Sequence, residues 1–276
     1  MRPRDGESVT LWGTRVVGPA ATRWLIAPVL QGIYASPPDV LCARAIFGPG
    51  RRIRGKLAAP EDGMGAMADA LHARLVAHGA TFQFGAAAES LDPSVPTAVC
   101  TNAPAAARLL APHAPRLAAA VGRIRTVSLL PVTAFYMPRA DDLRGFGVLF
   151  PRGGGVEALG ALFNADIFAG RSPVRSETWI YGDLDPARLP ASEADARARL
   201  AADRRAFSGS DEQPIALHAA GVPALLPVYD TAVIDVQAAL SDLPPWLGVT
   251  GNYLGKLGVS GLLEIAAETA KRLSQA

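Results

Sequence analysis

The end of the sequence constrains the fold most, because it reads as a strand, a glycine-rich loop and a helix in direct succession. We predict a strand over Trp246 to Thr250, a loop over residues 251–259 and a helix over about residues 260–274. The glycines of this region are Gly251, Gly255, Gly258 and Gly261. Glycines let the backbone approach a ligand closely, and the N-terminus of a helix presents free N–H groups to a phosphate or another electron-rich group. The spacing is not G-x-G-x-x-G, so a plain strand–helix corner remains as good an interpretation as a cofactor site.

Composition excludes several classes of protein. The chain has 276 residues, which at about 150 residues per domain gives just under two domains. Half of the residues are apolar and 19% are charged, so the chain can build a substantial core. The net charge of +2 does not indicate a nucleic-acid partner. Cys42 and Cys100 are too few for a disulfide framework, and a reducing cytoplasm is therefore the expected location.

The sequence offers no obvious metal site or catalytic triad. His72 and His78 are six residues apart, so they do not share a helix face at the spacing of metal ligands. We identify no arrangement typical of a hydrolase, no metal ligands and no catalytic acid or base. The longest early apolar stretch, residues 24–30, is much shorter than the roughly 20 residues of a membrane-spanning helix.

Periodicity predicts a mixture of helices and strands. Residues 8–35 suggest two short helices broken by Pro19 and Pro28, and Trp12 and Trp24 are expected to lie in the core. Other predicted helices are residues 40–47, a short alanine-rich helix after Asn102, residues 64–78 and residues 192–207. The predicted strands are residues 81–84, 97–101, 126–137, 147–150, 158–163 and 177–181.

Several stretches, taken in order, resemble the protoporphyrinogen oxidase branch of the flavin-containing amine oxidase superfamily. They cover nearly the whole chain, and no single motif among them decides the matter. The stretches are ESVTLWGTRVVGPAATRWLIAPVLQGIYASPPDVLCARAIF, EDGMGAMADAL, VCTNAPAAARLL, GFGVLFPRGGGVEALGALFNADIFAGRSP, LLPVY and WLGVTGNYLGKLGVSGLLEIAAETA.

This resemblance implies a fold, a cofactor and a site. The fold is α/β (α+β), with an incomplete FAD-binding Rossmann-like domain, an antiparallel-sheet substrate domain and a helical insertion. The chemistry implied is oxidation of a tetrapyrrole, such as a porphyrinogen, or of a related small-molecule substrate by hydride transfer to flavin. The residues that would face FAD are Gly251, Asn252, Gly258, Val259 and Ser260. The residues that would line the substrate pocket are Gly32, Phe146, Gly147 and Leu149.

The departures from the family pattern concern the dinucleotide-binding half. Members of the family begin with a strand, G-x-G-x-x-G and a helix that hold the pyrophosphate, and this sequence contains no such motif. The expected source of that half is either a partner chain or an upstream part of the reading frame. The expected division is a helical substrate- or membrane-side segment (1–60), a remnant of the FAD-binding domain (61–104 and 231–276) and a substrate domain (105–230). Residues 8–35 match the region by which family members dock on membranes, so we also expect peripheral contact with the inner membrane face.

Three interpretations of function follow from the sequence. The first is an FAD-dependent oxidoreductase whose dinucleotide-binding half lies elsewhere, and which is inactive as an isolated chain. The second is a non-catalytic binding or scaffold protein derived from the same fold. The third is an ordinary α/β domain with an accidental resemblance. The substrate, the electron acceptor and the oligomeric state do not follow from the sequence.

Overall fold

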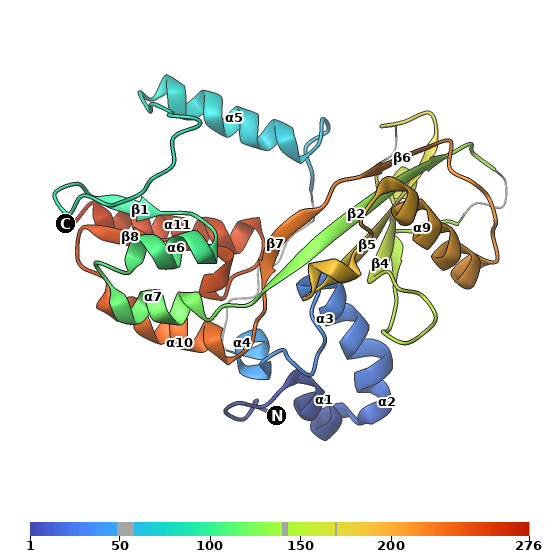
Figure 1. Cartoon of the computed structure of the whole chain (residues 1–276), viewed down its shortest axis with the longest axis horizontal. Coiled ribbons are helices and arrows are strands. Elements are labelled where there is room, and N and C mark those ends of the chain that lie inside the picture. The colour runs from blue at the N-terminus through green and yellow to red at the C-terminus, as the bar shows by residue number, and fades with distance from the viewer. Residues whose placement is uncertain (49–57, 140–142, 169, 276) are drawn as a thin grey trace. The chain divides into compact units, whose positions relative to one another are not determined.

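The computed structural model describes residues 1–48, 58–139, 143–168 and 170–275. Contacts divide the chain into two compact units, one of Met1–Gly48 with Pro93–Ala276 and the other of Pro49–Asp92. The sheets and the candidate site belong to the first unit, and Figure 1 shows the order of its elements.

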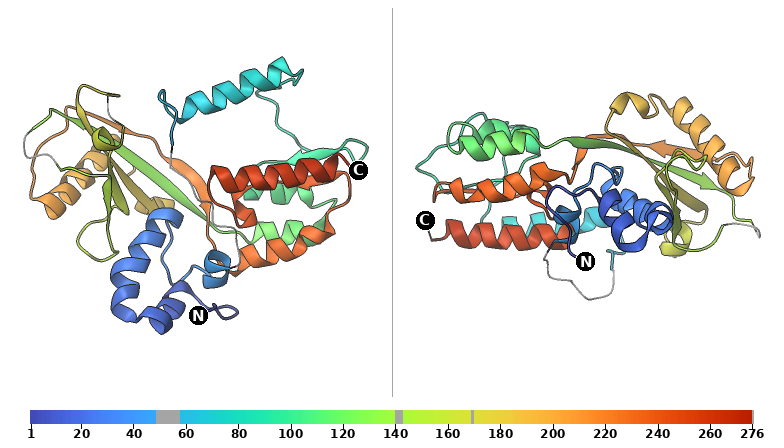
Figure 2. Two further views of the ribbon diagram at one scale, coloured as in Figure 1. Left: turned by 180° about the vertical axis from the view of Figure 1, so that it is seen from behind. Right: turned by 90° about the horizontal axis from the view of Figure 1, so that it is seen from below.

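A small parallel sheet forms one part of the first unit. It pairs β1 (Thr97–Val99) with β8 (Leu247–Val249), in the register Ala98 to Gly248. The helix α11 (Val259–Leu273) packs on the face of the sheet to which a side chain at Gly248 would point. It lies so close that a Cβ at Gly248 would collide with Thr269. Figure 2 shows α11 on the opposite side of this sheet from α6 and α7. The remaining helices here are α6 (Ala103–Leu110), α7 (Pro115–Gly122) and α10 (Thr231–Ala239).

An antiparallel sheet forms the other part of the first unit. Its strand order is β3-β4-β5-β2-β6, and β7 pairs with the beginning of β2. The long strand β2 therefore reaches from the neighbourhood of the parallel sheet to the far end of this one (Figure 1). The strands are β2 (Thr126–Tyr136), β3 (Gly147–Leu149), β4 (Gly160–Phe163), β5 (Arg175–Asp183), β6 (Ala216–Ala219) and β7 (Val222–Pro227).

Alternation of side chains gives the antiparallel sheet two different faces. The covered face packs Val132, Trp179 and Tyr181 against Ala196 and Leu200 of α9 (Glu193–Ser208). The other side, which we call the open face, is only partly buried. Its residues are Leu129, Pro131, Thr133 and Phe135 on β2, Thr178 and Ile180 on β5, Leu162 on β4, and Gly147 and Leu149 on β3.

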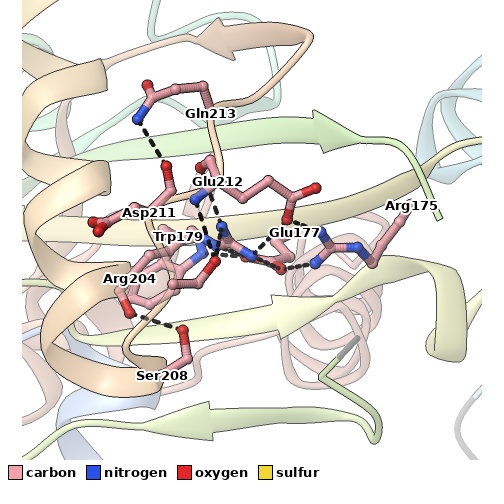
Figure 3. Close-up of polar contacts among 9 residues, drawn as sticks. Arg175, Glu177, Trp179, Arg204, Ser208, Asp211, Glu212 and Gln213 are labelled. Atoms are coloured by element: carbon pink, nitrogen blue, oxygen red, sulfur yellow. Dashed lines mark hydrogen bonds and ion pairs between the residues drawn. The ribbon is translucent and has the colours of Figure 1, made fainter. Parts of the chain in front are cut away.

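Buried charges hold α9 on the covered face (Figure 3). Arg204 of α9 donates to both carboxylate oxygens of Glu177 on β5, at 3.0 and 3.2 Å. Glu177 also accepts from the indole nitrogen of Trp179 at 3.0 Å and pairs with Arg175. Arg175 and Arg204 both lie over the ring of Tyr136. Burial raises the pKa of the Tyr136 hydroxyl, which therefore stays neutral.

The N-terminal helices are α1 (Val9–Val17), α2 (Pro19–Ala21), the π-helix η1 (Thr22–Ile26), α3 (Ala27–Tyr34) and α4 (Ala43–Phe47). The helix break predicted at Pro19 is confirmed, whereas the break predicted at Pro28 is wrong, because helical backbone continues from η1 through Pro28 into α3. Gly18, at a φ of 89°, ends α1, and Pro19 begins the next turn. Trp12 is half-buried and stacks on Phe47 at 4.3 Å. The expectation of a core position is wrong for Trp24, which is exposed.

The second unit contains α5 (Met64–Ala77), as predicted for residues 64–78. The strand predicted over residues 81–84 is wrong, since this segment runs as coil into a turn. Phe82 lies beside the ring of His72 on α5 at 4.3 Å, so the segment packs against the helix without entering a sheet. Residues 49–57 lie outside the described part of the chain.

The remaining elements compare as follows with the sequence predictions. The predictions of α4, α6 and α9, and of β1 to β5 and β8, are confirmed to within a few residues at their ends. Elements that the sequence analysis did not predict are α7, α10, β6, β7 and the short helix α8 (Asn164–Ile167). The predicted fold class is confirmed: a mixed α/β chain with an antiparallel sheet beside a parallel pair with helices on both sides.

Candidate functional site

The loop of residues 251–258, which we call the glycine loop, lies at the carboxyl edge of the parallel sheet. Because β1 and β8 run parallel, their C-terminal ends lie together, and Thr250 N–H donates to the Val99 carbonyl at 2.9 Å. In α/β proteins ligands bind outside this edge. The N-terminal end of α6 lies at this edge too. The side chain of Asn102 caps the helix there by accepting a hydrogen bond from Ala105 N–H at 3.2 Å.

Hydrogen bonds fix the first half of the glycine loop. The carbonyl of Asn252 accepts from the Tyr229 hydroxyl at 2.7 Å, and its side-chain amide donates to the Leu225 carbonyl at 3.3 Å. Gln237 on α10 donates to the Leu254 carbonyl at 3.0 Å. Gly251 allows the ring of Tyr253 to lie against the backbone, where a Cβ would collide with it. The Asn252 side chain therefore positions the loop beside β7.

The second half of the glycine loop leaves open space. Gly258 has a φ of 96° and nothing lies within 4 Å of the place where a Cβ would stand. It precedes α11, and no side chain caps that helix. Val259 and Ser260 are both exposed at the beginning of the helix. Uncapped N–H groups beside an open backbone fit an electron-rich ligand group.

The predicted substrate residues meet on the open face. A Cβ on Gly32 of α3 would lie 2.5 Å from the side chain of Leu149, so the absence of a side chain lets α3 lie against β3. Gly147 is similarly confined, since a Cβ there would collide with the Ala161 carbonyl. Register places Gly147 and Leu149 on the open face. Phe146, next to them, is 66% exposed.

Two tyrosines connect these groups of residues. The ring of Tyr34, at the end of α3, lies 4.9 Å from the ring of Tyr229, whose hydroxyl binds the Asn252 carbonyl. Burial raises the pKa of both hydroxyls, so both tyrosines are neutral. The structure therefore joins Gly32 and Leu149 to Asn252 through packed aromatic rings. Gly258, Val259 and Ser260 lie farther along the glycine loop, at the beginning of α11.

A sequence comparison identifies relatives of the chain. It is 29% identical over 148 residues to chloroplastic protoporphyrinogen oxidase 1 of Spinacia oleracea, a match that covers 49% of this chain and 26% of that protein. The match thus spans about a quarter of the curated relative. No family model matches the sequence.

Solved structures share the fold. The structure of a putative protoporphyrinogen oxidase from Exiguobacterium sp. 255-15 matches with a TM-score of 0.72 and 14% identity, over 98% of this chain and 69% of that one. The resemblance to protoporphyrinogen oxidases is confirmed. A reduced UDP-galactopyranose mutase also matches, with a TM-score of 0.71, 11% identity, and coverage of 100% of this chain and 69% of that one. One fold therefore serves proteins with different named activities, and the fold alone does not set the reaction.

The open face of this protoporphyrinogen-oxidase-like fold holds polar residues that the sequence analysis missed. Asn164 on α8 donates to the Thr178 hydroxyl at 2.8 Å, and the hydroxyls of Thr178 and Thr133 lie 2.8 Å apart. His218 on β6 pairs with Thr133 and continues the same row. The alternation in residues 126–137 could have assigned Thr133 to one face of its strand. The sequence could not show that Thr178 and His218 lie beside it, because that depends on the register of three strands.

Two further findings concern only the described residues. None of their helices has the length and apolar character needed to cross a membrane. Their His, Cys, Asp and Glu side chains do not gather in groups of three that could hold a metal ion.

Proposed function

We propose that the chain is part of an FAD-dependent oxidoreductase of the protoporphyrinogen oxidase and amine oxidase type, acting on a tetrapyrrole or a related substrate. The observation that carries this proposal is the position of the glycine loop, at the carboxyl edge of a parallel sheet and joined to an open, largely apolar sheet face. Bound FAD would accept a hydride from the substrate. The relatives that match in sequence are named as oxidases of protoporphyrinogen.

The chain's own residues would bind, orient and exclude water. Gly251, Asn252, Gly258, Val259 and Ser260 would hold FAD, with the open space at Gly258 admitting it and the N–H groups of α11 facing its electron-rich atoms. The substrate-binding residues in this proposal are Gly32, Phe146, Gly147 and Leu149. Such a site accelerates the reaction by positioning the substrate in a dry cleft, without an acid or base from the chain.

Further parallel strands, supplied by a partner chain or by an upstream segment, complete the proposal. The N–H of Thr97 and the carbonyl of Val99 form hydrogen bonds on the side of β8. Because the backbone groups of a strand alternate between its two edges, the N–H and carbonyl of Ala98 point to the edge of β1 that faces away from β8. Ala98 and Cys100 are exposed, although strands of parallel sheets are normally buried. We propose that residues 61–104 and 231–276 form one half of a dinucleotide-binding domain, that residues 105–230 form the substrate domain, and that a βαβ unit from a partner chain or an upstream segment adds the other half.

Uptake of flavin tests this function. Visible absorption spectra of the purified full chain would be recorded before and after addition of FAD and gel filtration, and released cofactor would be identified by mass. We expect retained flavin absorption. Retention would support a cofactor site in this chain, whereas a colourless chain would contradict self-sufficient flavin binding and direct the search to the partner.

The variant Gly258→Val tests the assigned residues. Valine at a φ of 96° is strained by about 1–3 kcal/mol and fills the open space, so we expect FAD affinity to fall about tenfold or more. Gly209→Val is the matched control, because Gly209 also has a positive φ, of 72°, with nothing within 4 Å, and it follows α9. Equal loss in both variants, or none in Gly258→Val, would show that the assigned site is wrong.

A second candidate is a binding protein without redox activity. The observation that favours it is that, in the described part of the chain, β1 and β8 are the only parallel pair. A chain that stays colourless with FAD yet binds a porphyrin would support this second function against the first.

A further inference from the structure

A polar cavity lies beside α9, on the side of the antiparallel sheet that this helix covers. Its volume is about 610 Å³, within the roughly 300–1,000 Å³ of small-molecule sites. Its wall comes from the turn between β3 and β4, the end of β5, the 3₁₀ turn η2 (Pro186–Arg188) and α9. Tyr181 and Asp183 of the wall alternate along β5 with residues of the open face, so the cavity is separate from the substrate residues of the proposed function.

Two arginines of the wall have unused hydrogen-bond donors. The side chain of Arg188 makes no hydrogen bond or ion pair within the described part of the chain, and its carbonyl accepts from Arg199 at 2.7 Å, which fixes the backbone there. Arg152 donates to the Gly182 carbonyl at 3.2 Å, and a guanidinium carries five N–H groups. The ion pair of Arg152 with Asp183, at 3.8 Å, is too long for a hydrogen bond. Both cations can therefore donate to a ligand.

The turn between β3 and β4 adds backbone donors to these arginines. Gly153 and Gly155 line the cavity with φ of 75° and 88°, and nothing lies within 4 Å of the place where a Cβ would stand on either. Their N–H groups make no hydrogen bond to any residue that the structure describes. Asp203 of α9 holds the end of this turn, since its carboxylate accepts from the N–H groups of Glu157 and Ala158 at 2.9 Å. Free N–H groups of a turn are typical partners of an anion such as phosphate.

Two carboxylates in the same wall select what else the ligand carries. Asp183 accepts from a backbone N–H at 2.9 Å, and Glu157 accepts from Arg199 at 3.1 Å. An ionised carboxylate can only accept hydrogen bonds, so each of the two has capacity left for a hydroxyl of a ligand. Val156 and Leu189, which pack against the core, supply an apolar part of the wall. The cavity therefore suits a ligand that carries both an anion and hydroxyl groups.

We propose that this cavity binds the phosphate monoester of a polyol, either a sugar phosphate or a nucleoside monophosphate, as a ligand distinct from the substrate and flavin of the proposed function. Arg152, Arg188 and the turn between β3 and β4 receive the phosphate, which arginines bind through paired hydrogen bonds. Asp183 and Glu157 accept from the sugar hydroxyls. An anion without hydroxyls would bring its charge towards these two carboxylates and offer them no donor.

Calorimetric titration of the full chain with four probes tests the site. The probes are ribose 5-phosphate, AMP, ribose and inorganic phosphate, at pH 7, where a phosphate monoester is mainly a dianion because its second pKa is about 6. The variants are Arg188→Gln and Arg152→Gln. The matched control is Arg108→Gln, because Arg108 of α6 is exposed like Arg188 and also has no hydrogen bond or ion pair to the described residues.

We expect ribose 5-phosphate to bind about tenfold or more tightly than ribose or inorganic phosphate, because it alone among these three reaches both the cations and the carboxylates. Both variants should bind it about tenfold or more weakly, whereas the control should bind it like the parent chain. Far-UV circular dichroism would check folding, which Arg188→Gln should not disturb because no described contact is lost. Tighter binding of AMP than of ribose 5-phosphate would identify a nucleotide as the ligand, and weaker binding a sugar phosphate.

The fate of this proposal is independent of the proposed function. Arg188→Gln should take up flavin like the parent chain, and a chain that stays colourless with FAD but binds ribose 5-phosphate supports the cavity site alone. Displacement of ribose 5-phosphate by FAD would assign the cavity to the cofactor and overturn the proposal. Equal loss in Arg188→Gln and Arg108→Gln, binding of inorganic phosphate as tight as that of the ester, or no binding of either ester would also overturn it.

Discussion

At the scale of single residues, the buried Glu177 is the side chain on which the covered face depends most. Its carboxylate is 1% exposed and is shared by Arg175, Arg204 and the Trp179 indole. Removing one partner of a buried ion pair leaves an uncompensated charge. The sequence predicted the strand around Glu177 but not this role, since its partner Arg204 comes from α9, 27 residues away.

The variant Glu177→Gln should destabilise the chain by about 3 kcal/mol or more, because two buried arginines would then lose the charged carboxylate that both of them contact. Urea denaturation, followed by the fluorescence of buried Trp179, measures the change. Glu157→Gln is the control, since Glu157 is 67% exposed in its pair with Arg199 and should lose less than about 1 kcal/mol. A loss in Glu177→Gln no larger than that of the control would show that the cluster does not hold α9.

Glu7 makes stability depend on pH at the residue scale. Its carboxylate accepts from Arg15 at 2.7 and 2.8 Å and from Arg4 N–H at 2.9 Å. The hydrogen bonds from Arg15, followed by that from Arg4, lower the pKa of Glu7 from 4.5 to about 2. A lowered folded-state pKa stabilises the chain fully above pH 4.5, and this contribution is lost as the pH falls towards 2.

We therefore expect Glu7→Gln to be less stable than the parent chain at pH 6, with the difference shrinking as the pH falls from 4.5 towards 2. Unfolding free energies from urea titrations at a series of pH values would measure it. Glu61→Gln, at an exposed position of the second unit, should track the parent chain throughout. A difference between Glu7→Gln and the parent that is constant with pH would contradict the role of the ionised carboxylate.

At the scale of elements, the local sequence pattern predicts the helices and strands that their own residues favour. It fails for the strands that form only because a neighbouring strand pairs with them. Residues 126–137 alternate strictly enough to predict β2, and Pro19 predicts the break after α1, although the helix continues through Pro28. By contrast β6 and β7 contain few β-branched residues, and Pro223 argues against a strand. They form because β2 offers them an edge. Residues 81–84 show the opposite case, a short segment of alternating polar and aromatic residues that lacks a partner strand in the described structure.

The candidate site also has one part that the sequence predicted and one part that it did not. The glycine loop and the residues beside it could be placed from the sequence, because strand, loop and helix are consecutive. The polar row of Asn164, Thr178 and Thr133 could not, since it is assembled from α8, β5 and β2 by strand register.

At the scale of the whole molecule, the first unit leaves a patch of large apolar side chains uncovered on its N-terminal helices. The patch consists of Leu11, Val17, Trp24, Leu25, Val29 and Ile33. Arg23 lies over the ring of Trp24, at 5.0 Å. Exposed apolar side chains with arginine and tryptophan suit a membrane interface, so we propose peripheral membrane contact through this patch.

We expect the chain to sediment with vesicles that contain anionic lipid, and Trp24→Ser combined with Leu25→Ser to reduce binding at least tenfold. Each side chain buries area worth roughly 1.5–3 kcal/mol in the acyl boundary. The control is Leu225→Ser, an exposed leucine on β7 outside the patch. Equal sedimentation of the double variant and the parent chain would place any membrane contact elsewhere.

The strict alternation along β2 sets what kind of sequence change this protein can tolerate. An insertion of one residue in the middle of β2 would exchange its two faces beyond that point. It would turn Val132 and Tyr136 towards the open face and press Thr133 and Phe135 under α9. Insertions in the turn between β3 and β4 leave this register untouched. Under the proposed function, ligand preference can therefore change through replacement of residues of β2 in place, whereas gains in length are confined to the turns.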